Sequence, residues 1–386
     1  MNGAPRRILM TADTVGGVWT YALELASALD NYDVQVALAT MGGLLNRDQR
    51  RQLRDLRNVQ VIESEFKLEW MQDPWADVEK AGEWLLGLDD DVRPDLIHLN
   101  NYAHGALPWS APTVMVGHSC VLSWWQTVRR SPISPEWKRY GVEVAKGLQS
   151  ADVVIAPSRD MLDRLKSFYG PLRRSRVIYN ARHPGLFAPQ EKEQIILTAG
   201  RVWDEAKNVS TLLEVAPDLP WPVCIAGEDK HPDKELTNRP RDKTKNVKLL
   251  GRLGQDKMAY WLGRASIYAA PAVYEPFGLS ILEAALSGCA LVLSDIPTLR
   301  EIWGQVATFV PPNDTAAWKS ALKQLIDNPA KHKENAAHAQ CRAIQFNPHQ
   351  FGAEYMSVYR EVLAVKREEQ SRRNCADQNV LSHAVV

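Results

Sequence analysis

One segment of the sequence combines two carboxylates, a glycine and the start of a helix. It reads Tyr274-Glu275-Pro276-Phe277-Gly278-Leu279-Ser280-Ile281-Leu282-Glu283-Ala284. A glycine lets the backbone approach a ligand closely, and the free N–H groups at a helix N-terminus stabilise a phosphate. A carboxylate in the first helical turns, Glu283, can accept hydrogen bonds from two adjacent hydroxyls, as on a ribose. Glu275 precedes the helix and could bond a second polyol, so the segment predicts a site for phosphate and sugar hydroxyls.

A second segment places two cations directly after another expected strand. It reads Gly200-Arg201-Val202-Trp203-Asp204-Glu205-Ala206-Lys207-Asn208. At the carboxyl end of a parallel strand, an Arg can clamp a diphosphate with two hydrogen bonds, and a Lys can hold it as a point charge. Fixed cations also stabilise the charge that grows on a departing phosphate. Arg201 and Lys207 are therefore candidates for stabilising a leaving group.

The first segment resembles the signature of GT-B fold glycosyltransferases of family 4, and the resemblance covers about residues 7–365. Members of that family are retaining enzymes that transfer a sugar from a nucleotide sugar to an acceptor hydroxyl. The resemblance implies that Arg201 and Lys207 bind the pyrophosphate and that Glu283 accepts hydrogen bonds from the ribose hydroxyls. It implies further donor contacts from Glu275 and from the backbone of Phe277, Gly278 and Leu279.

The resemblance extends to the N-terminal half. Gly16-Gly17 resembles the family's glycine loop, which comes close to phosphate or sugar. His118 follows an expected strand and stands where the family has a His near the reacting carbon, although a lone His is as often structural. We therefore expect the catalytic set to be His118, Arg201, Lys207 and Glu275, with weaker candidates at Asp13, Ser119 and Asn180.

Two stretches depart from the family pattern. Ala181 stands where the family often has Gly, and residues 297–301 replace a Gly-Gly-x-x-Glu stretch. The contribution of that second loop to the donor site is therefore open.

An aromatic and basic cluster follows His118. Trp124-Trp125 and Arg129-Arg130 could stack on sugars and hold an anion, which would make them the acceptor side. A packed helix with an exposed basic face is the slightly favoured alternative.

No metal or other cofactor is expected. Asp89-Asp90-Asp91 contains an Asp-x-Asp, but we interpret it as a solvated loop. Arg201 and Lys207 can neutralise the leaving group without a metal.

Apolar segments alternate with helical patterns along the chain, which predicts parallel sheets covered on both faces. Eleven strands are expected, at 7–12, 34–39, 59–63, 95–99, 113–116, 153–156, 194–199, 223–226, 247–250, 266–270 and 290–293. The fold class is α/β, with two doubly wound Rossmann-like domains that face each other across a cleft. Ligands bind such sheets at the carboxyl ends of the strands.

The domain boundaries follow from a Pro- and Gly-containing linker at 180–189. Residues 1–185 would form the acceptor-side domain and residues 186–346 the nucleotide-sugar-binding domain. Asn347-Pro348 begins a helix at 347–366 that we expect to pack back toward the first domain. The polar residues 367–386 predict a disordered tail.

The composition restricts the classes of molecule that the protein is expected to bind and the compartment in which it is expected to lie. The 386 residues carry 46 Lys and Arg against 46 Asp and Glu, which argues against a nucleic-acid binder. Scattered cysteines and the absence of a long apolar run predict a cytoplasmic protein. Peripheral contact with the inner face of a membrane remains open through a basic helix, although a solvated face is favoured. Its basic residues are Arg47, Arg50, Arg51, Arg54 and Arg57.

The resulting hypothesis is a retaining, metal-independent hexosyltransferase that uses a nucleotide-diphosphate sugar. The acceptor would be a glycan, a lipid-linked oligosaccharide or a small molecule. Three alternatives stay open: a nucleotide-sugar epimerase, a glycosyl phosphorylase of the same architecture, and a non-catalytic nucleotide-sugar-binding protein.

Overall fold

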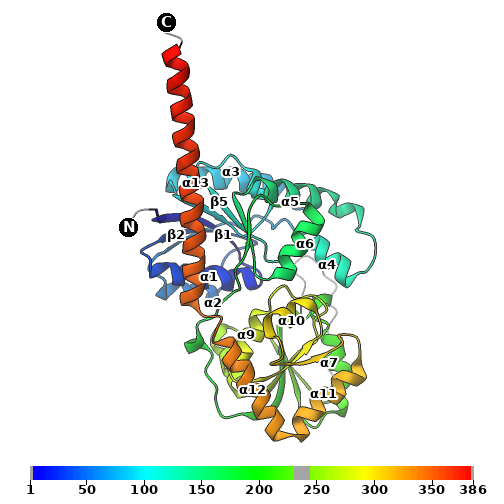
Figure 1. Cartoon of the computed structure of the whole chain (residues 1–386). Coiled ribbons are helices and arrows are strands. Elements are labelled where there is room, and N and C mark those ends of the chain that lie inside the picture. The colour runs from blue at the N-terminus through cyan, green and yellow to red at the C-terminus, as the bar shows by residue number, and fades with distance from the viewer. Residues whose placement is uncertain (1–2, 230–243, 384–386) are drawn as a thin grey trace.

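Two parallel β-sheets organise the protein in the computed structural model, which describes residues 3–229 and 244–383 (Figure 1). The first sheet has the strand order β3-β2-β1-β4-β5-β6-β7, and the second has the order β10-β9-β8-β11-β12-β13. Every strand pairs in parallel with its neighbours. The prediction of two doubly wound α/β domains is confirmed.

The strands match the expected apolar runs closely. Those of the first sheet are β1 (Arg7–Asp13), β2 (Gln35–Met41), β3 (Val59–Glu63), β4 (Leu96–Leu99), β5 (Thr113–Val116), β6 (Val153–Ala156) and β7 (Ser175–Val177). Those of the second are β8 (Glu193–Ala199), β9 (Val223–Ala226), β10 (Val247–Gly251), β11 (Ala265–Ala270), β12 (Ala290–Ser294) and β13 (Thr308–Val310). The sequence analysis missed β7 and β13 because each is a three-residue edge strand that is only partly buried.

Helices cover both faces of each sheet. In the first domain they are α1 (Gly17–Asp30), α2 (Arg47–Gln52), α3 (Trp75–Val92), α4 (Val121–Val128), α5 (Lys138–Ser150) and α6 (Arg159–Tyr169). In the second they are α7 (Val209–Val215), α8 (Gln255–Arg264), α9 (Leu279–Leu286), α10 (Pro297–Trp303), α11 (Thr315–Asp327) and α12 (Pro329–Ala343). The final helix is α13 (Pro348–His383).

Alternate residues of the central strands enter opposite hydrophobic clusters. Ile8 and Met10 of β1 pack with α1 and α13, whereas Leu9 packs on the other face with α3, α5 and α6. Both faces of the strand are therefore buried, which explains why these strands read as continuous apolar runs.

Helix α13 leaves the second domain and runs along the first, beyond which its end projects (Figure 1). An apolar stripe that includes Phe351, Tyr355 and Tyr359 joins the cluster on α1. Tyr359 Oη also lies 2.8 Å from Nδ1 of the buried His98 on β4. The chain therefore crosses between the domains a second time.

The structure corrects two expectations. Residues 367–383 continue α13 instead of forming a disordered tail; they lack Gly and Pro, and ion pairs such as Arg372–Glu368 link successive turns. Residues 384–386 of the expected tail lie outside the described residues. Asp89-Asp90-Asp91 belongs to helix α3 and not to a loop, and the buried Asp89 accepts hydrogen bonds from Ser110.

Helix α5 approaches the segment after β4 so closely that only glycine fits at their contact. A Cβ at Gly147 would lie 1.8 Å from the backbone oxygen of Tyr102. By contrast, a Cβ at Gly87 in α3 would meet nothing within 4 Å.

This difference predicts opposite effects of the same substitution. Gly147→Ala should lower the free energy of unfolding by about 3 kcal/mol, because backbone must move to admit the methyl group. Gly87→Ala should raise it by about 0.5–1 kcal/mol, because alanine favours a helix interior. Denaturant unfolding of both variants measures the difference; a Gly147→Ala protein as stable as the parent would contradict the contact.

Candidate active site

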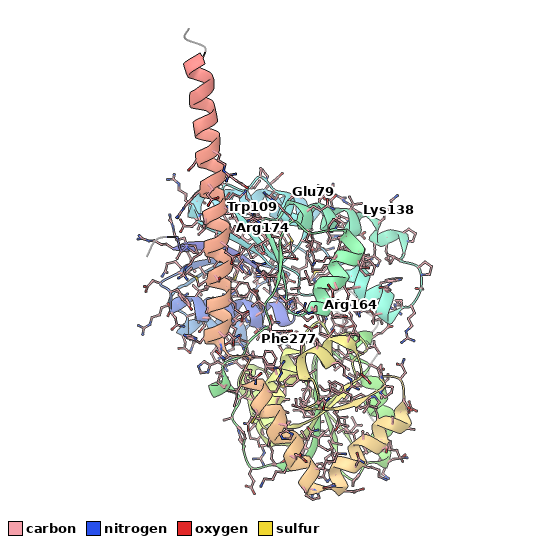
Figure 2. All side chains as sticks on the ribbon, viewed as in Figure 1. Glu79, Trp109, Lys138, Arg164, Arg174 and Phe277 are labelled. Atoms are coloured by element: carbon pink, nitrogen blue, oxygen red, sulfur yellow. The ribbon has the colours of Figure 1, made fainter. Side chains whose placement is uncertain are left out.

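A cleft of about 780 Å³ lies between the two domains. Phe277 of the second domain and Arg164 of the first mark the level at which the domains meet (Figure 2). The cleft is lined by all but one of the residues predicted for catalysis, donor binding and acceptor binding: Gly16, Gly17, His118, Trp124, Trp125, Arg129, Arg201, Lys207, Glu275, Phe277, Gly278, Leu279 and Glu283. Arg130 is the exception; it is exposed just beyond α4 and does not line the cleft.

The strand order explains why residues far apart in the chain meet here. In each sheet the order reverses beside its first strand, between β1 and β4 and between β8 and β11. The loops after these strands separate at the reversal and leave a crevice. Gly16 follows β1, Arg201 follows β8 and Glu275 follows β11, so the two crevices face each other.

The glycine loop lies directly against the second domain. Gly16 has a φ of +86° and caps α1, and a Cβ there would lie 3.7 Å from Nη1 of Arg201. A Cβ at Gly17 would lie 3.5 Å from Cδ1 of Leu279. The N-terminus of α1 therefore borders the same space as Arg201 and Leu279.

The two candidate cations are each paired with a carboxylate. Lys207 Nζ lies 2.5 Å from Oε2 of Glu275, and Arg201 Nη2 lies 2.8 Å from Oδ2 of Asp204. Burial acts to raise the pKa of Asp204, but Arg201, Lys207 and a hydrogen bond from Trp124 hold it below its usual range. The sequence analysis assigned no role to Asp204, which orients Arg201.

Helix α9 begins at the cleft. Gly278 caps it with a φ of +90°, and a Cβ there would lie 2.7 Å from Cδ1 of Ile281. Glycine is therefore required at the turn that aims the first N–H groups of α9 at the cleft.

Glu283 takes part in a buried triad that sequence reasoning missed. Arg182 of the interdomain linker lies between two carboxylates: its Nη1 is 2.8 Å from Oε2 of Glu24 on α1, and its Nε is 2.8 Å from Oε1 of Glu283 on α9. Arg182 and Glu24 are buried, and only 13% of the Glu283 side chain is exposed. Burial raises the pKa of Glu283, Arg182 lowers it, and Glu24 raises it further. No spacing or motif in the linker marks Arg182 as special.

His118 is held as a neutral imidazole. Burial lowers its pKa to about 3. The side-chain amide of Asn100 donates to the backbone oxygen of Thr11, so its Oδ1, 2.8 Å from His118 Nε2, accepts a hydrogen bond from the imidazole. The free lone pair is then on Nδ1. The ring also contacts Tyr21, with ring centroids 4.4 Å apart.

Two buried carboxyls lie at the first-domain end of the cleft. Burial and the neighbouring Glu69 raise the pKa of Asp13 to about 8. Burial raises the pKa of Glu69 to about 7, although the backbone N–H groups of Ala103 and Tyr102 donate to it. Asp13 was a weak candidate in the sequence, and Glu69, in a loop without a recognisable motif, was not a candidate.

The expected acceptor residues face the second domain. Trp124 Nε1 donates to Oδ1 of Asp204 at 3.0 Å, and Arg129 pairs with Glu205 at 2.9 Å. Both contacts bridge the domains. Helix α4 is thus a packed helix, as one alternative predicted. It also borders the cleft, as an acceptor-binding cluster would.

The remaining sequence candidates differ in their surroundings, and Oδ1 of the buried Asn180 has no hydrogen-bond partner. Ser119 Oγ lies 3.3 Å from Tyr274 Oη, and Asn180 is buried in the cleft. The altered stretch 297–301 forms α10, from which Glu301 accepts hydrogen bonds from the backbone of Arg159 and Asp160 at the start of α6.

Neither a metal centre nor a membrane span is found in the described parts of the chain. Within residues 3–229 and 244–383, no group of three His, Cys, Asp or Glu is placed to hold a metal ion. Over the same residues, no helix is long and apolar enough to cross a membrane. On the basic helix, Arg50 pairs with Glu63 and Arg51 with Asp256 of the second domain.

Known proteins match both halves of the chain. The family model "Glycosyltransferase Family 4" matches residues 15–184, and "Glycosyl transferases group 1" matches residues 193–328. A glycogen synthase of Mycobacterium tuberculosis is 30% identical over 281 residues, which cover 67% of this chain and 66% of that relative. The chain therefore spans 66% of the relative's length.

The fold also matches solved structures. The sucrose-phosphate synthase from Thermosynechococcus elongatus superposes with a TM-score of 0.80 at 19% identity, covering 93% of this chain and 100% of that one. Anabaena HepE in complex with UDP and glucose gives a TM-score of 0.71 at 16% identity, covering 92% and 99%. The two family models, the relative and the shared fold together show that the chain belongs to the GT-B fold glycosyltransferases of family 4.

Proposed function

We propose that the protein is a retaining glycosyltransferase that moves a hexose from a nucleotide-diphosphate sugar to an acceptor hydroxyl without a metal. The observation that carries the proposal is the convergence of Arg201, Lys207 and the N-terminus of α9 with the glycine loop of the opposite domain. This set supplies two cations and a helix end for a diphosphate, with a second domain against it. The relative named a glycogen synthase supports a hexosyl donor.

Donor binding exchanges ion pairs in this proposal. The diphosphate replaces Glu275 as the ion-pair partner of Lys207 and also binds Arg201. Both cations can then stabilise the negative charge that grows on the leaving phosphate. Glu275, released from Lys207, is then free to accept hydrogen bonds from sugar hydroxyls. Glu283 binds the ribose from the start of α9. Two cations can neutralise the diphosphate, which is why the proposal requires no metal or other cofactor.

Transfer proceeds by front-face substitution in this proposal. The acceptor hydroxyl attacks from the side the nucleotide leaves, and a phosphate oxygen of the leaving group takes its proton. His118, neutral and half-buried, offers its Nδ1 lone pair or its carbonyl to the positive charge on the sugar ring. Contacts that bridge the domains, such as Trp124 with Asp204, help to exclude water from the donor.

The first experiment combines a donor panel with a substitution at Lys207. Uridine-, guanosine- and adenosine-diphosphate hexoses are scored for binding, slow hydrolysis and transfer, with and without EDTA. Lys207→Gln should lower kcat for the preferred donor by about 10²–10³-fold, because it removes a cation that acts most strongly on the leaving group. Nucleotide affinity should fall far less, and EDTA should leave the activity of the parent unchanged.

A matched control is Lys323→Gln, which alters an exposed lysine on α11 outside the cleft and should leave kcat unchanged. Equal losses of donor binding and transfer in Lys207→Gln would contradict a leaving-group role. Donor binding without hydrolysis or transfer would favour the non-catalytic binding protein. Isomerised nucleotide sugar without acceptor would favour the epimerase.

The buried triad gives a separate prediction. Arg182→Met should lower the free energy of unfolding at pH 8 by about 3–5 kcal/mol, because Glu24 and Glu283 would both remain buried without their cation. Without it, the pKa of each carboxyl in the folded state rises further above the unfolded value. The loss should therefore be small at low pH, where both groups are protonated, and grow as the pH rises through the raised pKa values.

Denaturant unfolding at pH 5 and pH 8 measures this effect. The double variant Glu24→Gln/Arg182→Met leaves one fewer uncompensated carboxylate and should recover part of the lost stability. A loss independent of pH would show that Arg182 acts through packing, for which its contact with the ring of Phe187 is the alternative source.

A further inference from the structure

The first-domain end of the cleft contains buried polar atoms without a hydrogen-bond partner. They include Oδ1 of Asp13 and Oδ1 of Asn101, on residues that are 8% and 7% exposed. Nδ1 of His104 joins them; its Nε2 lies 3.0 Å from the backbone oxygen of Val78 and donates to it, so Nδ1 carries a lone pair. All three residues line the cleft.

Nδ1 of His104 and Oδ1 of Asn101 are hydrogen-bond acceptors, and Oδ1 of Asp13 accepts in the carboxylate and in the acid protonated on Oδ2. Buried polar atoms are normally satisfied, so a group of unpartnered acceptors in a cleft indicates a ligand that supplies donors. Hydroxyl groups supply donors, whereas an ionised phosphate or carboxylate supplies none.

The titratable groups at this end of the cleft also disfavour the binding of an anion. Asp13 and Glu69 are carboxyls, and the nearby His118 is neutral. Of the cations that line the cleft, Arg201, Lys207, Arg129 and Arg182 are paired with carboxylates. Arg252 lies on the second domain, and Lys67 is exposed and donates to the backbone oxygen of Gln72. An anionic group placed against Asp13 would lose its hydration beside two buried carboxyls whose raised pKa values show that burial already disfavours charge there.

Indole rings complete this end of the cleft. Trp70 lines it and donates its N–H to the carboxyl of Asp13, and Trp137 lines it with an unpartnered indole N–H. An indole presents an apolar face beside a polar edge, which suits a sugar ring whose C–H face is apolar and whose rim carries hydroxyls.

We propose that Asp13, with Asn101 and the indoles of Trp70 and Trp137, forms the acceptor-binding site and selects a neutral carbohydrate whose hydroxyl donates to Oδ1 of Asp13. This inference rests on the proposed glycosyl transfer and names the class of its acceptor. A phosphorylated sugar or a phospholipid headgroup, bound through its phosphate, does not fit this end of the cleft.

The test compares neutral sugars with phosphorylated counterparts. Glucose, maltose and maltotetraose are offered as acceptors with the preferred donor, against glucose 6-phosphate and myo-inositol 1-phosphate. At least one neutral sugar should be used with a kcat/KM at least tenfold above that of either phosphorylated compound. Binding of the same sugars in the presence of the nucleoside diphosphate is followed by tryptophan fluorescence, since Trp70 and Trp137 line the site. Failure of all the neutral sugars both to bind and to accept overturns the proposal.

Substitution of Asp13 separates acceptor recognition from donor chemistry. Asp13→Asn keeps the shape and replaces a carboxyl whose burial already favours the neutral form, so the fold should persist. The acceptor KM should rise at least tenfold, while the donor KM and donor hydrolysis without acceptor stay within twofold of the parent. Asn101→Ala should raise the acceptor KM in the same way, and the control Asp90→Asn, an exposed residue of α3, should change nothing.

The outcomes distinguish this proposal from the proposed function. Preferred use of a phosphorylated acceptor, or an unchanged acceptor KM in Asp13→Asn, overturns the assignment of this end of the cleft while donor turnover stands. Loss of donor binding and hydrolysis in the unmodified protein would instead refute the glycosyltransferase mechanism itself.

Discussion

A single buried guanidinium ties the site to the arrangement of the domains. Arg182 belongs to the linker, yet it holds Glu24 of the first domain and Glu283 of the second at 2.8 Å each. A buried Arg between two carboxylates is stable only while all three groups stay together, because any one left alone would be a costly charge. The triad therefore ties the middle of α1 to the second turn of α9, and both helices begin at the cleft. Glu283 is also the proposed ribose contact. A change at Arg182 in the linker would therefore also alter the proposed donor site.

The fold could be predicted because its central strands are continuous apolar runs. Strands such as β1 and β12 are buried on both faces, so their sequence shows them directly. Two parallel series of such strands lead to two doubly wound sheets, and the order reversal in each leads to facing crevices. The positions of Gly16 and Arg201 in the cleft followed from their places just after strands, and that of Gly278 from its place at the start of a helix. The short edge strands β7 and β13 carry too few apolar residues to give the same signal.

The parts of the site that the sequence did not reveal depend on contacts between distant segments. Asp204 matters because it orients Arg201 and accepts a hydrogen bond from Trp124 of the other domain. Glu69 lies in a loop without periodicity and is significant only because folding brings it beside Asp13. Likewise, Arg50 of α2 pairs with Glu63 and Arg51 pairs with Asp256 of the second domain, contacts that no local pattern indicated. Local patterns specify elements, whereas these pairings require the tertiary structure.

The charges divide the cleft into two chemically different ends. The second-domain end carries Arg201 and Lys207, which are paired with Asp204 and Glu275. The first-domain end carries Asp13 and Glu69, whose pKa values of about 8 and about 7 show that burial disfavours their charged forms. A ligand with a diphosphate is therefore attracted in one orientation, and a neutral polyol can relieve the unsatisfied carboxyl at the other end. In the proposed mechanism, the sugar to be transferred lies between the two ends, next to His118, whose neutral ring adds no positive charge to oppose the one that develops there.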